Sequence, residues 1–161
     1  MILVGSDAIA MALASYYGSK GGQEMSRQLN TPRFRLQGQH SRLINHWEKE
    51  GVLDDPRPLG NGWREYSFMD FVWIRIIDNL RQFNFSLDKI KTVKAGLEKV
   101  KKEGALSKMP ILEVHVRELI SNQRSFEVVV GPDGTVDVGS TSGIDFSIRI
   151  GGIDSVIRID L

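Results

Sequence analysis

With 161 residues, the chain can bury a hydrophobic core as one medium domain or two small ones, and its 41% hydrophobic content is ordinary for a globular protein. It contains no cysteine, which excludes disulfides, thiolate metal sites and thiol catalysis. No apolar run approaches the roughly 18 residues that a transmembrane helix needs. We therefore expect a cytoplasmic protein that does not associate with membranes.

The net charge of +1 hides an uneven distribution along the chain. Residues 31–102 contain 14 Lys and Arg against 9 Asp and Glu, an excess of +5. Residues 126–161 contain 2 against 6, which gives −4. A polyanion would therefore bind to the middle of the chain and not to its acidic end.

The N-terminal region, residues 1–30, carries no motif with a recognisable function. It lacks the basic start of a signal peptide and contains Asp7. Residues 6–17 suit a short helix, with Ser6 as its cap and Gly18 after its end. The Gly-Ser-Lys-Gly-Gly run at 18–22 predicts a flexible linker.

Residues 31–40 allow two interpretations. Thr31 and Pro32 are typical of a helix start, with threonine as the cap and proline in the first turn. However, Phe34 and Leu36 alternate as they would in a strand.

The segment Ser41–Gly51 predicts an amphipathic helix with a serine cap and a terminating glycine. Leu43, Ile44 and Trp47 share one face. The opposite face could simply be solvated, but its residue types also bind base edges or phosphates in a DNA major groove: Arg42, Asn45, His46 and Lys49.

A glycine-rich turn follows, and Asn61-Gly62 within it is a strong signal for a tight β-hairpin. Such a hairpin would bring Arg57 and Arg64 together at one tip, with Tyr66 beside them. Two arginines and a tyrosine on a thin hairpin suit phosphates or a narrow minor groove. The alternative is a surface loop whose arginines are incidental to DNA binding.

Two further helices follow this turn. Ser67 and Asp70 form a capping box before a helix that is apolar over most of its circumference, which predicts a core helix. Ser86 caps the next helix, where an apolar seam at steps of three and four suggests helix pairing: Ile90, Val93, Leu97 and Val100.

The C-terminal part changes to a β pattern. Residues 111–123 favour a helix, although Leu112, Val114 and Val116 also alternate as in a strand. Residues 126–130 with 135–138, and residues 144–150 with 153–159, each predict a hairpin across a glycine-containing turn.

No catalytic motif, phosphate-binding loop or cofactor-binding glycine pattern occurs, so we expect neither an enzyme nor a cofactor. The three histidines, His40, His46 and His115, lack metal-ligand spacing. The aspartates of the C-terminal strands could form a carboxylate cluster, but strand alternation places such residues on the solvent face: Asp137, Asp145, Asp154 and Asp160.

From Gly38 to about Leu97, the sequence resembles the MerR family of bacterial transcription regulators. Three stretches and Arg57 carry the resemblance: INHWEKEGVL at 44–53, GWREYS at 62–67 and FSLDKIK at 85–91. The corresponding family pattern is an aromatic-Glu-x-x-Gly-Leu-Leu helix end, a wing ending in Gly-Tyr-Arg-x-Tyr, and a later Gly-Phe-Ser-Leu-x-Glu-Ile.

The resemblance implies a dimeric winged helix-turn-helix whose recognition helix enters the major groove while the wing touches the backbone. Arg42 matches a DNA-contacting position of the family, whereas Asn45 replaces a usual arginine and His46 a usual tyrosine. Arg57, Arg64 and Tyr66 match wing positions. The first helix of the motif is truncated, and a long dimerisation helix is not evident.

We therefore expect an α+β protein with a winged helix-turn-helix core, supporting helices and a small antiparallel β-rich C-terminal region. Its expected divisions are 1–30, a DNA-binding domain at 31–104 and a C-terminal region at 105–161. The expected function is sequence-specific binding of double-stranded DNA by a homodimer, in transcription, plasmid maintenance or recombination. The C-terminal region would take a protein partner or a small effector. A scaffold protein that keeps the winged-helix core and assembles through its β-rich end is the alternative.

Overall fold

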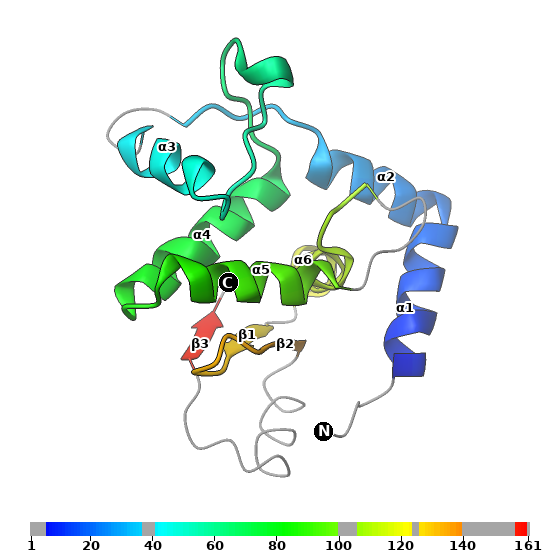
Figure 1. Ribbon diagram of the computed structural model, residues 1–161. Helices are drawn as coiled ribbons and strands as arrows, with labels where there is room; N and C mark the ends of the chain where they lie inside the picture. Colours follow the sequence, from blue (N-terminus) through cyan, green and yellow to red (C-terminus); the bar gives the residue numbers. More distant parts are fainter. Residues whose placement is uncertain (1–5, 37–40, 100–105, 124–125, 140–156, 161) are drawn as a thin grey trace.

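The computed structural model describes residues 6–36, 41–99, 106–123, 126–139 and 157–160. In chain order the elements are α1 (Ser6–Gly18), α2 (Lys20–Asn30), α3 (Ser41–Lys49), the 3-10 turn η1 (Pro58–Gly60), α4 (Phe68–Gln82), α5 (Leu87–Glu98), α6 (Pro110–Asn122), β1 (Glu127–Val130), β2 (Val136–Gly139) and β3 (Ile157–Asp160). Figure 1 shows α4 and α5 in the centre, the sheet beneath α5, and the loop that carries η1 projecting from the opposite side. The fold is α+β, as predicted.

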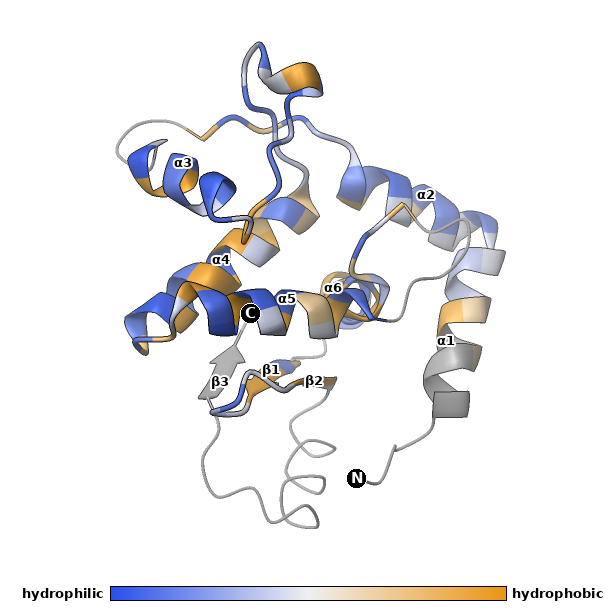
Figure 2. Ribbon diagram, viewed as in Figure 1, coloured by the Kyte–Doolittle hydropathy of each residue, from blue (hydrophilic) through white to orange (hydrophobic). Residues whose placement is uncertain are grey.

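The core is built around α4, which buries a stripe of large side chains, including Trp73, Ile76, Ile77 and Leu80. One hydrophobic cluster joins this stripe to Leu29 of α2, Trp47 of α3, Leu112 of α6 and Val128 of β1. Figure 2 shows much of α4 and α6 coloured as hydrophobic, while α2 and α3 are mostly hydrophilic. The predicted C-terminal region therefore shares its core with the helices before it.

Local signals placed the central helices correctly. The Ser67 hydroxyl accepts a hydrogen bond from the Asp70 backbone N–H, and the Asp70 carboxylate accepts one from the Ser67 backbone N–H. This is the predicted capping box. Ser86 caps α5 through the Lys89 N–H in the same way.

The apolar seam of α5 is occupied within the chain. Ile90, Val93 and Leu97 are buried at 0%, 0% and 3% exposure in the shared core, and α5 packs against α6 and β2. Val100 lies outside the described residues. These side chains are consequently unavailable to a partner helix, so the seam gives no support to the predicted homodimer.

The predicted flexible linker at 18–22 is instead a tight corner between two helices. The Ser19 hydroxyl accepts a hydrogen bond from the Gly22 N–H and caps α2. Gly22 packs directly on α1, because a Cβ there would lie 1.8 Å from the Tyr16 carbonyl oxygen. The glycine thus permits close helix packing, a role that composition alone cannot distinguish from flexibility.

The structure of residues 31–36 contradicts the predicted helix start and supports the predicted strand in part. Thr31 ends α2, with its backbone N–H bonded to the Arg27 carbonyl, and does not start a helix. Phe34 forms a single antiparallel bridge with Tyr66. The segment therefore runs beside the end of the predicted wing.

The sheet has the order β2-β1-β3, and both pairings are antiparallel. The predicted hairpin of 126–130 with 135–138 is confirmed as β1 and β2. The last predicted strand is β3, whose neighbour in the sheet is β1. Its expected partner at 144–150 lies outside the described residues. The helix expected at 111–123 is confirmed as α6, which excludes the strand alternative.

Candidate nucleic-acid interface

Helix α3 is anchored to the core by its inner face and by its C-terminal end. Ile44 and Trp47 are buried at 2% and 4% exposure. At the end of the helix, the N–H groups of Val52 and Leu53 both donate to the Trp47 carbonyl. The indole nitrogen of Trp73 donates to the Val52 carbonyl at 2.8 Å, which ties this end of α3 to α4.

The outward face of α3 is made of the four predicted polar residues, all exposed: Arg42, Asn45, His46 and Lys49. Their spacing of three and four places them on one continuous face. Leu43, which was predicted to lie on the inner face, is 48% exposed. The inner face therefore rests on Ile44 and Trp47 alone.

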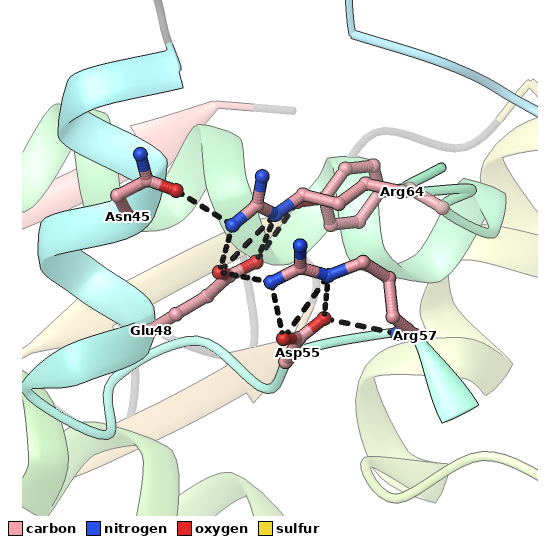
Figure 3. Close-up of polar contacts among 6 residues, drawn as sticks. Asn45, Glu48, Asp55, Arg57 and Arg64 are labelled. Atoms are coloured by element: carbon pink, nitrogen blue, oxygen red, sulfur yellow. Dashed lines mark hydrogen bonds and ion pairs between the residues drawn. The ribbon is translucent and has the colours of Figure 1, made fainter. Parts of the chain in front are cut away.

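Glu48 organises the contact between α3 and the wing loop (residues 54–65). Its side chain is 9% exposed. The Arg64 Nε lies 2.9 Å from one carboxylate oxygen, and Arg64 Nη2 lies 2.8 Å from the other. The hydroxyl of Tyr66 donates to the same carboxylate at 3.2 Å. Figure 3 shows the two arginines, Arg57 and Arg64, converging on Glu48 from the wing loop.

Arg57 is held mainly by Asp55. Its Nη2 and Nε lie 2.6 Å and 2.9 Å from the two Asp55 carboxylate oxygens, and its Nη2 is 4.0 Å from Glu48. These hydrogen bonds lower the pKa of Asp55 to about 2. The pairing with Asp55 also raises the pKa of Arg57, and the pairing with Glu48 raises that of Arg64.

The same network reaches the outward face of α3 at one residue. Arg64 Nη2 donates to the Asn45 side-chain oxygen at 2.6 Å. Arg64 thereby joins two α3 side chains, Asn45 and Glu48, that lie one turn apart.

The wing loop differs from the predicted hairpin. Within residues 41–99, no strand ladder joins its two arms, and η1 occupies its tip. Pro56 and Pro58 deprive the first arm of N–H donors for a ladder. Leu59 has a φ of 58°, and Gly60 and Gly62 also have positive φ values. The chain therefore curls at the tip and does not pair.

The tip is apolar and exposed, with Leu59 at 97% and Trp63 at 79% exposure. The guanidinium of Arg35 lies 5.5 Å from the centre of the Trp63 ring and also pairs with Glu65 at 2.8 Å. The predicted arrangement, with Arg57 and Arg64 at the tip, is therefore wrong, because both arginines point to the base of the loop.

The structure sorts the seven predicted contact residues into three groups. The side chains of Arg42, His46 and Lys49 are exposed and have no hydrogen bond or ion pair within the described part of the chain. The side chains of the second group take part in the hydrogen bonds and ion pairs around Glu48 and Asp55, which we call the wing base: Asn45, Arg57 and Arg64. Tyr66 is 1% exposed, and burial raises its pKa, so it supports the loop from inside.

The sequence reasoning gave no role to Glu48 or Asp55, although both decide where the arginines point. Glu48 belongs to the aromatic-Glu pattern at the end of α3, and an acidic residue in a polar helix face signals a partner nearby. Asp55 stands two residues before Arg57, which is the spacing of a local turn contact.

Residues 35–97 match the family model described as MerR HTH family regulatory protein. The similarity to the MerR family therefore covers this segment of the chain, as predicted. No curated protein and no solved structure matches the chain in the two other comparisons.

The matched segment covers α3, the wing loop, α4 and most of α5, and leaves α1, α2, α6 and the sheet outside it. Only four residues, 37–40, lie between Leu36 and the first residue of α3. The first helix of the motif, predicted to be truncated, would fall in this segment, which lies outside the described residues.

No group of three or more histidines, carboxylates or cysteines that could hold a metal ion occurs among the described residues. None of the described helices is long and apolar enough to cross a membrane.

Proposed function

We propose that this protein binds double-stranded DNA sequence-specifically as a transcription regulator, with α3 in the major groove. The observation that carries the proposal is the outward face of α3. There Arg42, His46 and Lys49 stand exposed and unpaired within the described residues, inside a MerR-family domain. Arginine and lysine at such a face bind guanine edges or phosphates, and a helix is the element that fits the major groove.

The wing loop takes a supporting role in this proposal. Arg57 and Arg64 already satisfy two carboxylates, and moving them to phosphates would leave Asp55 and Glu48 without their partners. Their contribution is to hold the loop at a fixed angle to α3. The exposed tip then lies beside the helix and touches the DNA surface through Asn61 and the loop backbone.

Dimerisation is proposed on the family resemblance. A MerR-type protein that binds two half-sites would place its two α3 helices in successive major grooves, about 34 Å apart or a multiple of that distance. Light scattering at tens of micromolar, with and without DNA, should give twice the mass of the chain. A monomer mass in both conditions would refute the dimer.

The test of DNA binding is a selection from random duplex DNA, followed by titration of the selected and scrambled duplexes. The wild-type protein should enrich a defined sequence. The variant Arg42→Ala/Lys49→Ala should bind that sequence much more weakly. Arg75→Ala/Lys99→Ala is the control, because it removes the same charge from exposed sites on α4 and just after the end of α5. Failure of the wild type to enrich any sequence, or equal loss in both variants, would contradict the proposal.

A further inference from the structure

The hydrogen bond from Arg64 to Asn45 controls which part of the Asn45 amide faces outward. A guanidinium carries donors only, so the atom that it contacts at 2.6 Å must be the amide oxygen of Asn45. The amide nitrogen of Asn45 therefore points away from Arg64, as Figure 3 shows. On the outward face of α3, Asn45 presents a donor.

Arg64 is itself firmly held in this position. Two of its nitrogens contact the Glu48 carboxylate at 2.8 to 3.2 Å, and Glu48 also accepts the Tyr66 hydroxyl. Glu48 and Asn45 lie three residues apart on one helix, so a single guanidinium spans both. Charge-assisted bonds of this kind are short and resist rearrangement.

This arrangement has a consequence for base reading, which rests on the proposed DNA-binding function. A free asparagine recognises adenine with both amide atoms, donating to N7 and accepting from N6. That pair requires the oxygen and the nitrogen to face the same base edge. Here the oxygen faces Arg64 and the nitrogen faces away from it.

We propose that Arg64 is a specificity-determining residue that acts through Asn45, by making Asn45 a donor-only reader of the major groove. A donor-only side chain matches base pairs by their acceptors there: a G·C pair offers guanine O6 and N7 side by side, whereas an A·T pair offers adenine N7 and thymine O4 with the adenine N6 donor between them. The two neighbouring guanine acceptors therefore make a G·C pair the better match. Adenine loses the bidentate pair that would favour it.

The test compares sequences selected from random duplexes by the wild type and by three variants. Asn45→Ala identifies the base position that Asn45 reads, because preference at that position alone is lost. The wild type should prefer a G·C pair there. Arg64→Met, which frees the amide oxygen, should shift the preference toward adenine by about fivefold or more, the effect of one net hydrogen bond.

Arg57→Ala is the matched control. It removes the other wing arginine beside Glu48 but has no contact with Asn45, so base preference should stay that of the wild type. If Arg64→Met fails to fold by circular dichroism, Glu48→Gln/Arg64→Met replaces it, because this pair leaves no unpaired carboxylate behind.

The outcomes separate this inference from the proposed function. A wild type that enriches no sequence overturns both. A wild type with a defined sequence refutes the inference alone in three cases: Asn45→Ala loses no preference, the pair preferred at the position read is A·T, or Arg64 substitution leaves the preference unchanged. A shift toward adenine in the Arg64 variant, and not in Arg57→Ala, supports it.

Discussion

The outward face of α3 and the base of the wing loop carry the same kinds of side chain in different states. On α3, Arg42 and Lys49 are exposed and unpaired within the described residues. At the wing base, Arg57 and Arg64 are 21% and 26% exposed and each meets a carboxylate at 2.8 Å or less. The role of a cation is therefore set by the acidic residue nearest to it in space, and residue type alone does not reveal it.

The largest expected effect is a loss of stability when Glu48, the central residue of the wing base, is replaced. Glu48→Ala removes the partner of Arg64 and Tyr66 at a mostly buried site, and should lower the free energy of unfolding by about 2–4 kcal/mol. Urea denaturation measures the loss. Glu50→Ala is the control, since the Glu50 side chain has no partner among the described residues. Equal stability of the two variants would show that the wing base does not hold the loop.

A smaller effect is expected from substitutions on the outward face of α3. Arg42→Ala should weaken binding to the selected duplex by roughly 1–3 kcal/mol, and much less on a scrambled duplex, if Arg42 pairs with a base edge. Fluorescence anisotropy titrations on both duplexes measure it, with Arg75→Ala as the control. Equal weakening on the two duplexes would assign Arg42 to a phosphate and not to a base.

The wing tip should respond independently of the wing base. Leu59 is 97% exposed with a φ of 58°, a conformation that is strained for leucine. Leu59→Gly should therefore raise the free energy of unfolding by up to about 1 kcal/mol, because glycine adopts this conformation freely. Leu59→Ala keeps the Cβ and should give no gain. A loss of stability in the glycine variant would mean that the leucine side chain is needed for packing.

The smallest effect concerns the Asp55–Arg57 pair and acid pH. Arg57 lowers the pKa of Asp55 to about 2. The contribution of this pair to stability is thus complete above the unfolded pKa near 4 and is lost as the pH falls toward 2. Titration of the Asp55 carboxyl by nuclear magnetic resonance should show the low pKa in the wild type and a return toward 3.8 in Arg57→Ala. A normal pKa in the wild type would show that the pair does not form in solution.

Local signals predicted the parts of the fold that local chemistry determines. The Ser67 and Ser86 caps, the core stripe of α4 and the first β-hairpin follow from short patterns, and the structure confirms them. The polar face of α3 could be predicted because helical spacing fixes which residues are neighbours.

What the sequence missed depends on contacts between elements, which local patterns do not reveal. The 16-residue separation between Glu48 and Arg64 hides the bond that turns Arg64 inward. Gly22 was mistaken for a flexible position because its packing partner, Tyr16, becomes visible only when α1 folds back on α2. The α5 seam was assigned to a partner chain, although α6 and β2, later in the sequence, help to cover it.

The salt dependence of DNA affinity tests the central claim most directly. Each lost phosphate contact reduces the slope of log K against log salt by about one unit. Arg42 and Lys49 are expected to contact the DNA, and the wing arginines are not. Arg42→Ala/Lys49→Ala should therefore flatten the slope by one to two units. Arg57→Ala should leave it unchanged. A flattened slope for Arg57→Ala, with no change for the α3 variant, would contradict the account and place the DNA contact on the wing.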